Sequence, residues 1–485
     1  MNRTSHLTAV LSAALFLTGA LVRQASGAEK RILANGLTVI LEKDASSANT
    51  VLQILIKGGM RAEPSGKRGL AFLTTRLAVE IPDSRKAQEL IGLATRFSVT
   101  AGGDSSLINI ECLSVNLEPS VKVLSKIFLD PLFSGLRIDA VKKHMEHQSQ
   151  VEEDDSVRLA HLAGLKGFFS GSGYGGSIYG DKDSLEAIKN KDVSEFYKSL
   201  FVGKNIIMCF ASDLPDEAIV ELVNRYFGGL PPGTAAGFGP LSPAPPERAL
   251  RLERDTRQAY VGLAYLLPGI SPRNFARASV LESLLGKGQG SRLWPLRAER
   301  KLAYNVNCRV AQMRDGGILE AYLETDAAKK ESARDALRSM LDELCRNGIS
   351  GEELQDAKNV AKTDFMRENE LKAARAGTLA FFEDAGLGAE FFDALFSEVD
   401  ALSLDEVNSV VREMLAPEKA LEVIVGPNPG GGGDPELFLR APAGQFFGPP
   451  GGVFHRQQDL FIGAAQIGCD LGLRRHPAGT HLHMA

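Results

Sequence analysis

The stretch GMRAEPSGKRGLAFLTTR, residues 59–76, lies between two predicted elements of different kinds. The apolar run VLQILI at 51–56 before it is typical of a strand, and residues 69–81 have the apolar spacing of a helix. The alternation continues along the chain, with a further strand and two helices predicted at 108–112, 119–128 and 137–151. Strands and helices are therefore expected to alternate throughout this region.

Upstream of this stretch, the dipeptide Asn35-Gly36 stands between two apolar runs at 31–34 and 37–41. Asparagine and glycine tolerate the positive φ angles of tight turns, so an Asn-Gly pair between apolar runs predicts a β-hairpin. The first sheet is expected to begin with this hairpin.

The middle of the chain changes in composition. Residues 228–246 contain GGLPPG followed by four more prolines, which continue neither a helix nor a strand and predict an interdomain linker. Beyond it, strands are predicted at 259–267 and 317–324, a helix at 276–285 and one long helix at 352–375. Each half closes with a helix and then an apolar strand, at 192–210 and at 404–425. This pattern indicates a duplicated α+β unit.

Residues 1–27 have the features of a secretory signal peptide. Arg3 precedes an apolar run at 7–22, and the small residues at 25–27 suit cleavage before Ala28. This run of 16 residues is shorter than the ~20 needed to span a bilayer. We therefore expect an exported, periplasmic or extracellular protein without a stable membrane span after cleavage.

The composition limits the possible partners. The chain of 485 residues has 55 basic and 60 acidic side chains, so it lacks the basic excess of nucleic-acid-binding proteins. Its length and 44% apolar content favour two or more domains. Five scattered cysteines without a C-x-x-C pair predict neither a zinc cluster nor a disulfide framework: Cys112, Cys209, Cys308, Cys345 and Cys469.

The segment 428–485 is rich in glycine and proline, a composition that buries a core poorly and predicts a poorly ordered tail. Three histidines lie in it, at His476, His481 and His483. We interpret them as incidental rather than as a metal site.

With these elements in place, the chain from about Leu33 to Pro427 resembles the insulinase-like (pitrilysin) zinc peptidases. Members of that family carry NGL on a first strand and then G.R.E....GLAH..EH, whose inverted H-x-x-E-H gives two histidine ligands and a glutamate base. The resemblance implies an α+β fold of duplicated metallopeptidase-like domains, each a mostly antiparallel sheet packed by helices. We assign these domains to 28–230 and 251–427, joined by a linker at 231–250.

The metal motif is degenerate in this chain. Aligned on Gly69-Leu70-Ala71, the first histidine of the family is Phe72, the glutamate is Thr75 and the second histidine is Arg76. A phenyl ring has no lone pair, threonine is no base near neutral pH, and arginine repels a dication. We expect no metal in this chain.

The third zinc ligand of the family, a glutamate, aligns with Gln148, whose neutral amide is a poor ligand. Glu146 is close enough in sequence to leave the register open. His144 and His147 lie three residues apart without a carboxylate in register, so a replacement metal site is not favoured.

The second half keeps another part of the family pattern. GQGSRLWPLRAERKLAY, residues 288–304, resembles the family segment G..SRLf..LRe...LaYsv. The resemblance assigns Arg297 and Tyr304 as the arginine and tyrosine that, in the family, reach the metal site from the opposite domain and stabilise the oxyanion. The alternative is that Arg297 pairs with Glu299 or Glu282 and that Tyr304 only packs.

Some relatives of this family work as two chains, one with the metal motif and one with the Arg/Tyr pair. Our hypothesis is that this chain is the second kind. It needs no cofactor of its own, zinc is expected in a homologous H-x-x-E-H partner, and the substrate is a peptide or an unfolded segment. The alternative hypothesis is a catalytically inactive peptide-binding or scaffold protein of the cell envelope.

Overall fold

The computed structural model describes residues 27–81, 84–239, 241, 243, 248–427 and 438–440. The predicted signal peptide, apart from Gly27, and the tail histidines lie outside these residues. In the described part, no helix is both long and apolar enough to cross a membrane.

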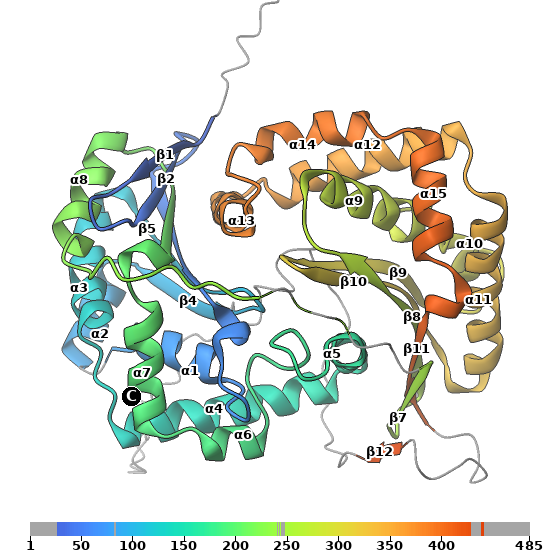
Figure 1. Ribbon diagram of the computed structural model, residues 1–485, viewed down its shortest axis with the longest axis horizontal. Helices are drawn as coiled ribbons and strands as arrows, with labels where there is room; N and C mark the ends of the chain where they lie inside the picture. Colours follow the sequence, from blue (N-terminus) through green and yellow to red (C-terminus); the bar gives the residue numbers. More distant parts are fainter. Residues whose placement is uncertain are drawn as a thin grey trace, which may run out of the picture.

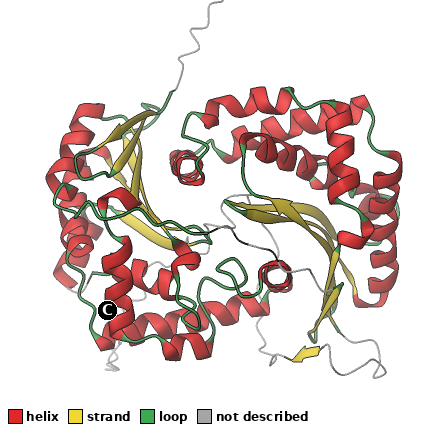
Figure 2. Ribbon diagram, viewed as in Figure 1, coloured by secondary structure: helices red, strands yellow, loops and turns green. Residues whose placement is uncertain are grey.

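Two six-stranded sheets form the framework, one in each half of the chain (Figures 1 and 2). The first has the order β1-β2-β6-β3-β5-β4, and only the β2·β6 pair is parallel. Its strands are β1 Glu29–Ile32, β2 Thr38–Lys43, β3 Asn49–Lys57, β4 Arg96–Ala101, β5 Ser105–Leu113 and β6 Ile206–Ser212.

The second sheet repeats this plan with the order β12-β7-β11-β8-β10-β9, and β7 is parallel to both of its neighbours. Its strands are β7 Ala249–Glu253, β8 Gln258–Pro268, β9 Asn305–Met313, β10 Gly316–Asp326, β11 Leu421–Gly426 and β12 Phe438–Arg440. The predicted α+β class, with mostly antiparallel sheets packed by helices, is confirmed.

The predicted N-terminal hairpin is present. β1 and β2 pair antiparallel around a turn in which Gly36 has a φ of 84°. The Asn35 side chain accepts from the Leu37 N–H at 3.2 Å and donates to the Phe227 carbonyl at 3.0 Å. The turn therefore also ties the first sheet to the end of helix α8, Asp216–Phe227.

Helices cover both sheets. Those of the first half are α1 Leu70–Leu77, α2 Ser84–Gly92, α3 Leu117–Leu129, α4 Gly135–Asp154, α5 Ser156–Phe169, α6 Lys182–Ala187, α7 Asn190–Leu200 and α8 Asp216–Phe227. Those of the second half are α9 Pro272–Gly286, α10 Trp294–Ala298, α11 Lys330–Asn347, α12 Gly351–Glu368, α13 Lys372–Ala385, α14 Phe391–Asp400 and α15 Leu404–Met414. Short 3-10 helices lie at η1 Gly59–Ala62, η2 Ser114–Asn116, η3 Gly203–Asn205, η4 Ala327–Lys329 and η5 Pro417–Lys419.

The prediction of one long helix at 352–375 is wrong, because α12 ends at Glu368 and α13 begins at Lys372. The buried Asn369 amide donates to the Phe365 carbonyl at 2.8 Å and accepts from the Thr378 hydroxyl at 2.6 Å. Asparagine competes with the helical backbone in this way, so the chain turns between the two helices. The turn directs α13 toward the other half.

The two halves exchange helices (Figure 1). Helix α13 of the second half packs against β3 and β6 of the first sheet, where Ala376 and Leu379 join its core. Helix α5 of the first half packs against β8 and β11 of the second sheet, where Phe168 and Leu165 are buried. Each sheet therefore buries one face against a helix from the other half, which fixes the halves together.

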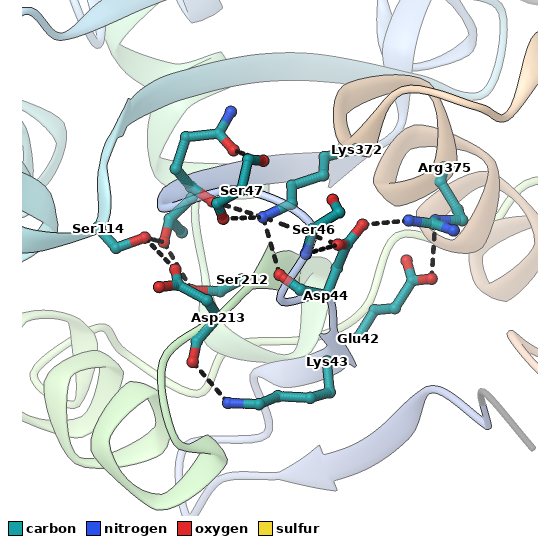
Figure 3. A network of polar contacts seen from close by, with 12 residues as sticks. Glu42, Lys43, Asp44, Ser46, Ser47, Ser114, Ser212, Asp213, Lys372 and Arg375 are labelled. Atoms are coloured by element: carbon teal, nitrogen blue, oxygen red, sulfur yellow. Dashed lines mark hydrogen bonds and ion pairs between the residues drawn. The ribbon is translucent and has the colours of Figure 1, made fainter. Parts of the chain in front are cut away.

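A polar network reinforces the α13 contact (Figure 3). The Lys372 Nζ donates to the backbone carbonyls of Asp44, Ser47 and Asn49, each at 2.8 Å. Arg375, one turn later, forms ion pairs with Asp44 and, at 2.8 Å, with Glu42. We call this set the interdomain latch.

Two predicted boundaries differ from the structure. β7 begins at Ala249, inside the predicted linker 231–250, because Glu422 of β11 pairs with that residue. Within the predicted tail, residues 438–440 form β12 beside β7, so the prediction of a poorly ordered tail does not hold for these three residues. Edge pairing needs only backbone groups, which composition does not reveal.

Candidate functional site

Helix α1 carries the degenerate metal motif, and most of it belongs to the core. Phe72 is 4% exposed, and its ring meets that of Tyr179 edge-on with centroids 4.9 Å apart. Thr75 is 1% exposed, and its hydroxyl donates to the Ala71 carbonyl at 2.8 Å. Neither residue offers a free ligand atom.

Glu63 is the glutamate of the G.R.E part of the family pattern, and its side chain caps the start of α1. Its Oε1 accepts from the N–H groups of Gly69 at 3.0 Å and Ala71 at 2.9 Å. Burial raises the pKa of Glu63 to about 8, although these hydrogen bonds and the Arg68 charge act in the opposite direction. This carboxylate of the sequence pattern therefore caps a helix.

The position of the third family ligand lies on α4, which packs against α1. On α4, Gln148 and His144 are partly buried, whereas Glu146 and His147 are exposed. In the ranges that the structure covers, no group of three or more His, Cys, Asp or Glu residues is placed to hold a metal ion. The absence of zinc from this chain stays a prediction.

Arg297 and Tyr304 flank the turn between α10 and β9. Arg297 is exposed, and its guanidinium carbon lies 5.1 Å from the centre of the Trp294 ring. Arg297 has no ion pair with any described residue, and Glu282 lies 3.5 Å from the Lys287 Nζ instead. The expected alternative pairing of Arg297 with Glu282 or Glu299 is therefore not observed.

Tyr304 is 54% exposed, so it is not a packing residue. Its hydroxyl donates to the Asp326 carboxylate at 2.5 Å, and this hydrogen bond raises the pKa of the phenol. Its backbone N–H donates to the Glu324 carbonyl at 2.8 Å. The phenol is thus a neutral donor on a fixed backbone, but one that must leave Asp326 to serve another acceptor.

A cavity of about 830 Å³ lies between the halves. Its walls come from the end of β4 with Gly102 and Gly103, from α5, from the segment 174–179, from the end of α9, and from β9, β10 and α12. Neither the Arg297/Tyr304 pair nor the degenerate motif positions belong to its lining. Neither of the two sets of residues that the resemblance places at an active site therefore forms a wall of this cavity.

Two sheet edges, those of β9 and β4, border this cavity. β9 is closed by the end of α9, where a Cβ on Gly286 would lie 2.0 Å from the Cys308 nitrogen. β4 pairs only with β5 among the described strands. An unpaired edge offers backbone donors and acceptors to an extended segment. Thr100 and Ala101 place this edge at the cavity wall.

A buried ion pair joins the halves beside the cavity. Nδ1 of His161 on α5 lies 2.5 Å from Oε2 of Glu320 on β10, and Arg309 Nε lies 3.5 Å from the same oxygen. Burial alone would raise the pKa of Glu320, but the charges of His161 and Arg309 lower it. Glu320 therefore holds α5 and β9 from opposite sides.

A second interdomain contact centres on Asp104. Its carboxylate accepts from the Tyr174 hydroxyl at 2.7 Å, the Arg61 guanidinium at 3.1 Å and the Arg314 backbone N–H at 2.9 Å. Arg61 also pairs with Asp315 at 2.7 Å. These contacts dock the β9·β10 turn onto the first half.

The fold and the site together define a two-domain metallopeptidase-like protein with a degenerate metal motif. A sequence profile described as "Insulinase (Peptidase family M16)" matches residues 38–181, and one described as "Peptidase M16 inactive domain" matches residues 187–361. The chain belongs to the insulinase-like M16 family. It is a member without a self-sufficient peptidase site.

Relatives agree with this assignment. The chain is 23% identical over 381 residues to "Non-peptidase homolog YmxG" of Helicobacter pylori, covering 77% of this chain and 88% of that protein. It is 23% identical over 475 residues to the mitochondrial "Ubiquinol-cytochrome-c reductase complex core protein I" of Euglena gracilis, covering 87% and 91%. A crystal structure of a "peptidase M16 inactive domain" from Pseudomonas fluorescens has a TM-score of 0.75 at 22% identity, covering 83% and 98%.

Proposed function

We propose that this chain is the non-metal-binding subunit of a two-chain zinc peptidase and that Arg297 and Tyr304 act in trans at the active site of the partner. The partner is a homologous H-x-x-E-H chain that carries the zinc. Attack on a peptide carbonyl builds negative charge, and a guanidinium with a phenol O–H would stabilise that charge. The substrate is a peptide or an unfolded segment.

One contrast carries this proposal. The positions that would serve a metal in this chain, Phe72 and Thr75, are enclosed in the core, whereas Arg297 and Tyr304 are exposed. An exposed arginine without an ion pair in the described part of the chain is available to a group outside it. The separation of this pair from the internal cavity supports a role toward another chain.

A second candidate function is peptide holding without catalysis. The cavity and the β4 edge favour it, because an extended peptide could pair with Thr100 and Ala101 there. The Euglena relative is, by its name, a core protein of a complex, which supports a scaffold role as well. In this second candidate function, Arg297 and Tyr304 no longer take part in catalysis.

Either role is proposed for the periplasm or the extracellular space, following removal of residues 1–27. Affinity purification of the tagged chain from its native cell, followed by elemental analysis, tests the partner proposal. We expect one co-purifying H-x-x-E-H chain and about one zinc per pair. Capture of peptides with neither zinc nor such a chain would favour the second candidate.

A further inference from the structure

The position of the lost metal motif brings one arginine close to two histidines. Helices α1 and α4 run antiparallel, because Arg137 near the start of α4 donates to the Glu80 carbonyl at 2.6 Å and Met145 lies against Gly69. This register brings His144 to within about a turn of Arg76 across the helix pair. His147 follows three residues later, on the same face of α4 as His144.

Arg76 has no protein acceptor in the described part of the chain. It forms no hydrogen bond or ion pair there, and its one ring contact is with Phe97, 5.9 Å from the guanidinium carbon. The Arg76 side chain is partly buried, but none of its nitrogens is a fully buried atom without a hydrogen-bond partner. The guanidinium therefore keeps donors available to a small ligand from solvent.

The two histidines also lack protein partners in the described part of the chain. Neither His144 nor His147 has a hydrogen-bond partner among the described residues. Burial and the charges of Arg76 and His147 lower the pKa of His144, which places all three in one electrostatic environment. Burial and the Arg137 charge also lower the pKa of Arg76, against the opposing effect of Glu80. Glu80 already faces Arg137, 3.8 Å from its guanidinium.

We propose that Arg76, with His144 and His147, forms an anion site for carboxylate or phosphate oxygens where the family binds a metal. A guanidinium suits such oxygens because it donates in a planar fork, and the imidazoles add donors from the facing helix. Two sources supply this chemistry: free inorganic phosphate, or a carboxylate on a bound peptide. The site does not depend on the proposed partner role.

The test uses the mature full chain with labelled histidine rings. Inorganic phosphate, N-acetylglycine and neutral N-acetylglycinamide are titrated separately at constant ionic strength while the ring signals of His144 and His147 are followed by NMR. We expect a saturable shift with at least one of the two anions and none with the amide. A shift with phosphate alone assigns free phosphate, and a shift with N-acetylglycine assigns a peptide carboxylate.

Arg76→Gln should weaken the apparent affinity at least tenfold, whereas Lys143→Gln, on an exposed position of α4, should change it less than twofold. If Arg76→Gln does not fold, His147→Asn at the exposed histidine serves instead and should weaken binding at least threefold. No saturable shift with either anion, or wild-type affinity in the variant used, would overturn the proposal.

Discussion

Lys372 reaches across the two halves and donates from Nζ to the backbone carbonyl of Asp44 at 2.8 Å. The same ammonium satisfies the carbonyls of Ser47 and Asn49, and its side chain is only 6% exposed. One cation thus fixes a whole turn of the first half against α13. Within the latch, Lys372 binds backbone carbonyls, so the cost of removing its ammonium group falls mainly on these three acceptors.

We expect Lys372→Met to destabilise the chain by about 2 to 4 kcal/mol, because a buried acceptor without a donor costs roughly 1 to 3 kcal/mol and water can reach part of this turn. Urea unfolding measures the change, and amide exchange should rise at residues 44–49. Lys191→Met is the control, since the Lys191 side chain is 80% exposed and should change stability by less than about 0.5 kcal/mol. Equal stability of the two variants would contradict the latch.

Glu42 gives the latch a pH dependence. Burial raises its pKa from 4.5 to about 7, and this outweighs the opposing charges of Arg375 and Lys372; Asp44 and Asp393 raise it further. Between these two values the folded chain holds a proton that the unfolded chain has lost. The free energy of unfolding should therefore fall as pH rises from about 4.5 to 7, and the loss should persist above 7.

Glu42→Gln should remove this contribution. The variant should equal the wild type in stability near pH 4.5 and exceed it near pH 8, by an amount on the order of 3 kcal/mol at most. Glu63 and Asp384, whose pKa values are also raised by burial, to about 8 and about 6, titrate in both proteins and cancel in the comparison. Parallel stability curves for the two proteins across this range would show that Glu42 does not titrate as argued.

Restoring the metal motif should not restore an enzyme. The triple variant replaces Phe72 by His, Thr75 by Glu and Arg76 by His. It removes the phenyl ring that packs against Tyr179 and places a carboxylate at position 75, where the side chain is 1% exposed. Gln148 still supplies no carboxylate. We expect a loss of stability of about 3 kcal/mol or more and no hydrolysis of peptides.

Val115→Glu is the matched control, because it adds a carboxylate where the side chain is 83% exposed, and it should be nearly neutral. Thermal unfolding and a zinc-supplemented peptide assay measure both variants. Robust cleavage by the triple variant would mean that the core around α1 accommodates a metal site.

The sequence was informative where local chemistry decides the structure. The Asn35-Gly36 pair predicted a hairpin because turn geometry depends on adjacent residues. The break between α12 and α13 was missed, since it depends on the Asn369 amide bonding to Thr378, nine residues away. The helix exchange also escaped prediction, because apolar spacing shows that a helix face is buried but not in which half it is buried.

At the candidate site, too, some features could be predicted from the sequence and others could not. The loss of ligand chemistry at Phe72, Thr75 and Arg76 was readable from residue types alone. The interdomain contacts of Asp104 and Glu320 were not, because their partners lie up to 210 residues away and include a backbone N–H. Arg61 was visible in the motif frame, but nothing in the sequence joined it to Asp315.

The most direct test of the account is steady-state kinetics of peptide cleavage by the native two-chain complex carrying Arg297→Ala or Tyr304→Phe in this chain. If both donors act on the substrate of the partner, kcat should fall about 100- to 1000-fold while association stays intact, the usual cost of losing one oxyanion donor. Arg292→Ala is the control and should be far milder, because Arg292 pairs with Glu353 at 2.7 Å inside the second half. Cleavage by the Arg297→Ala and Tyr304→Phe complexes at the wild-type rate would contradict the account.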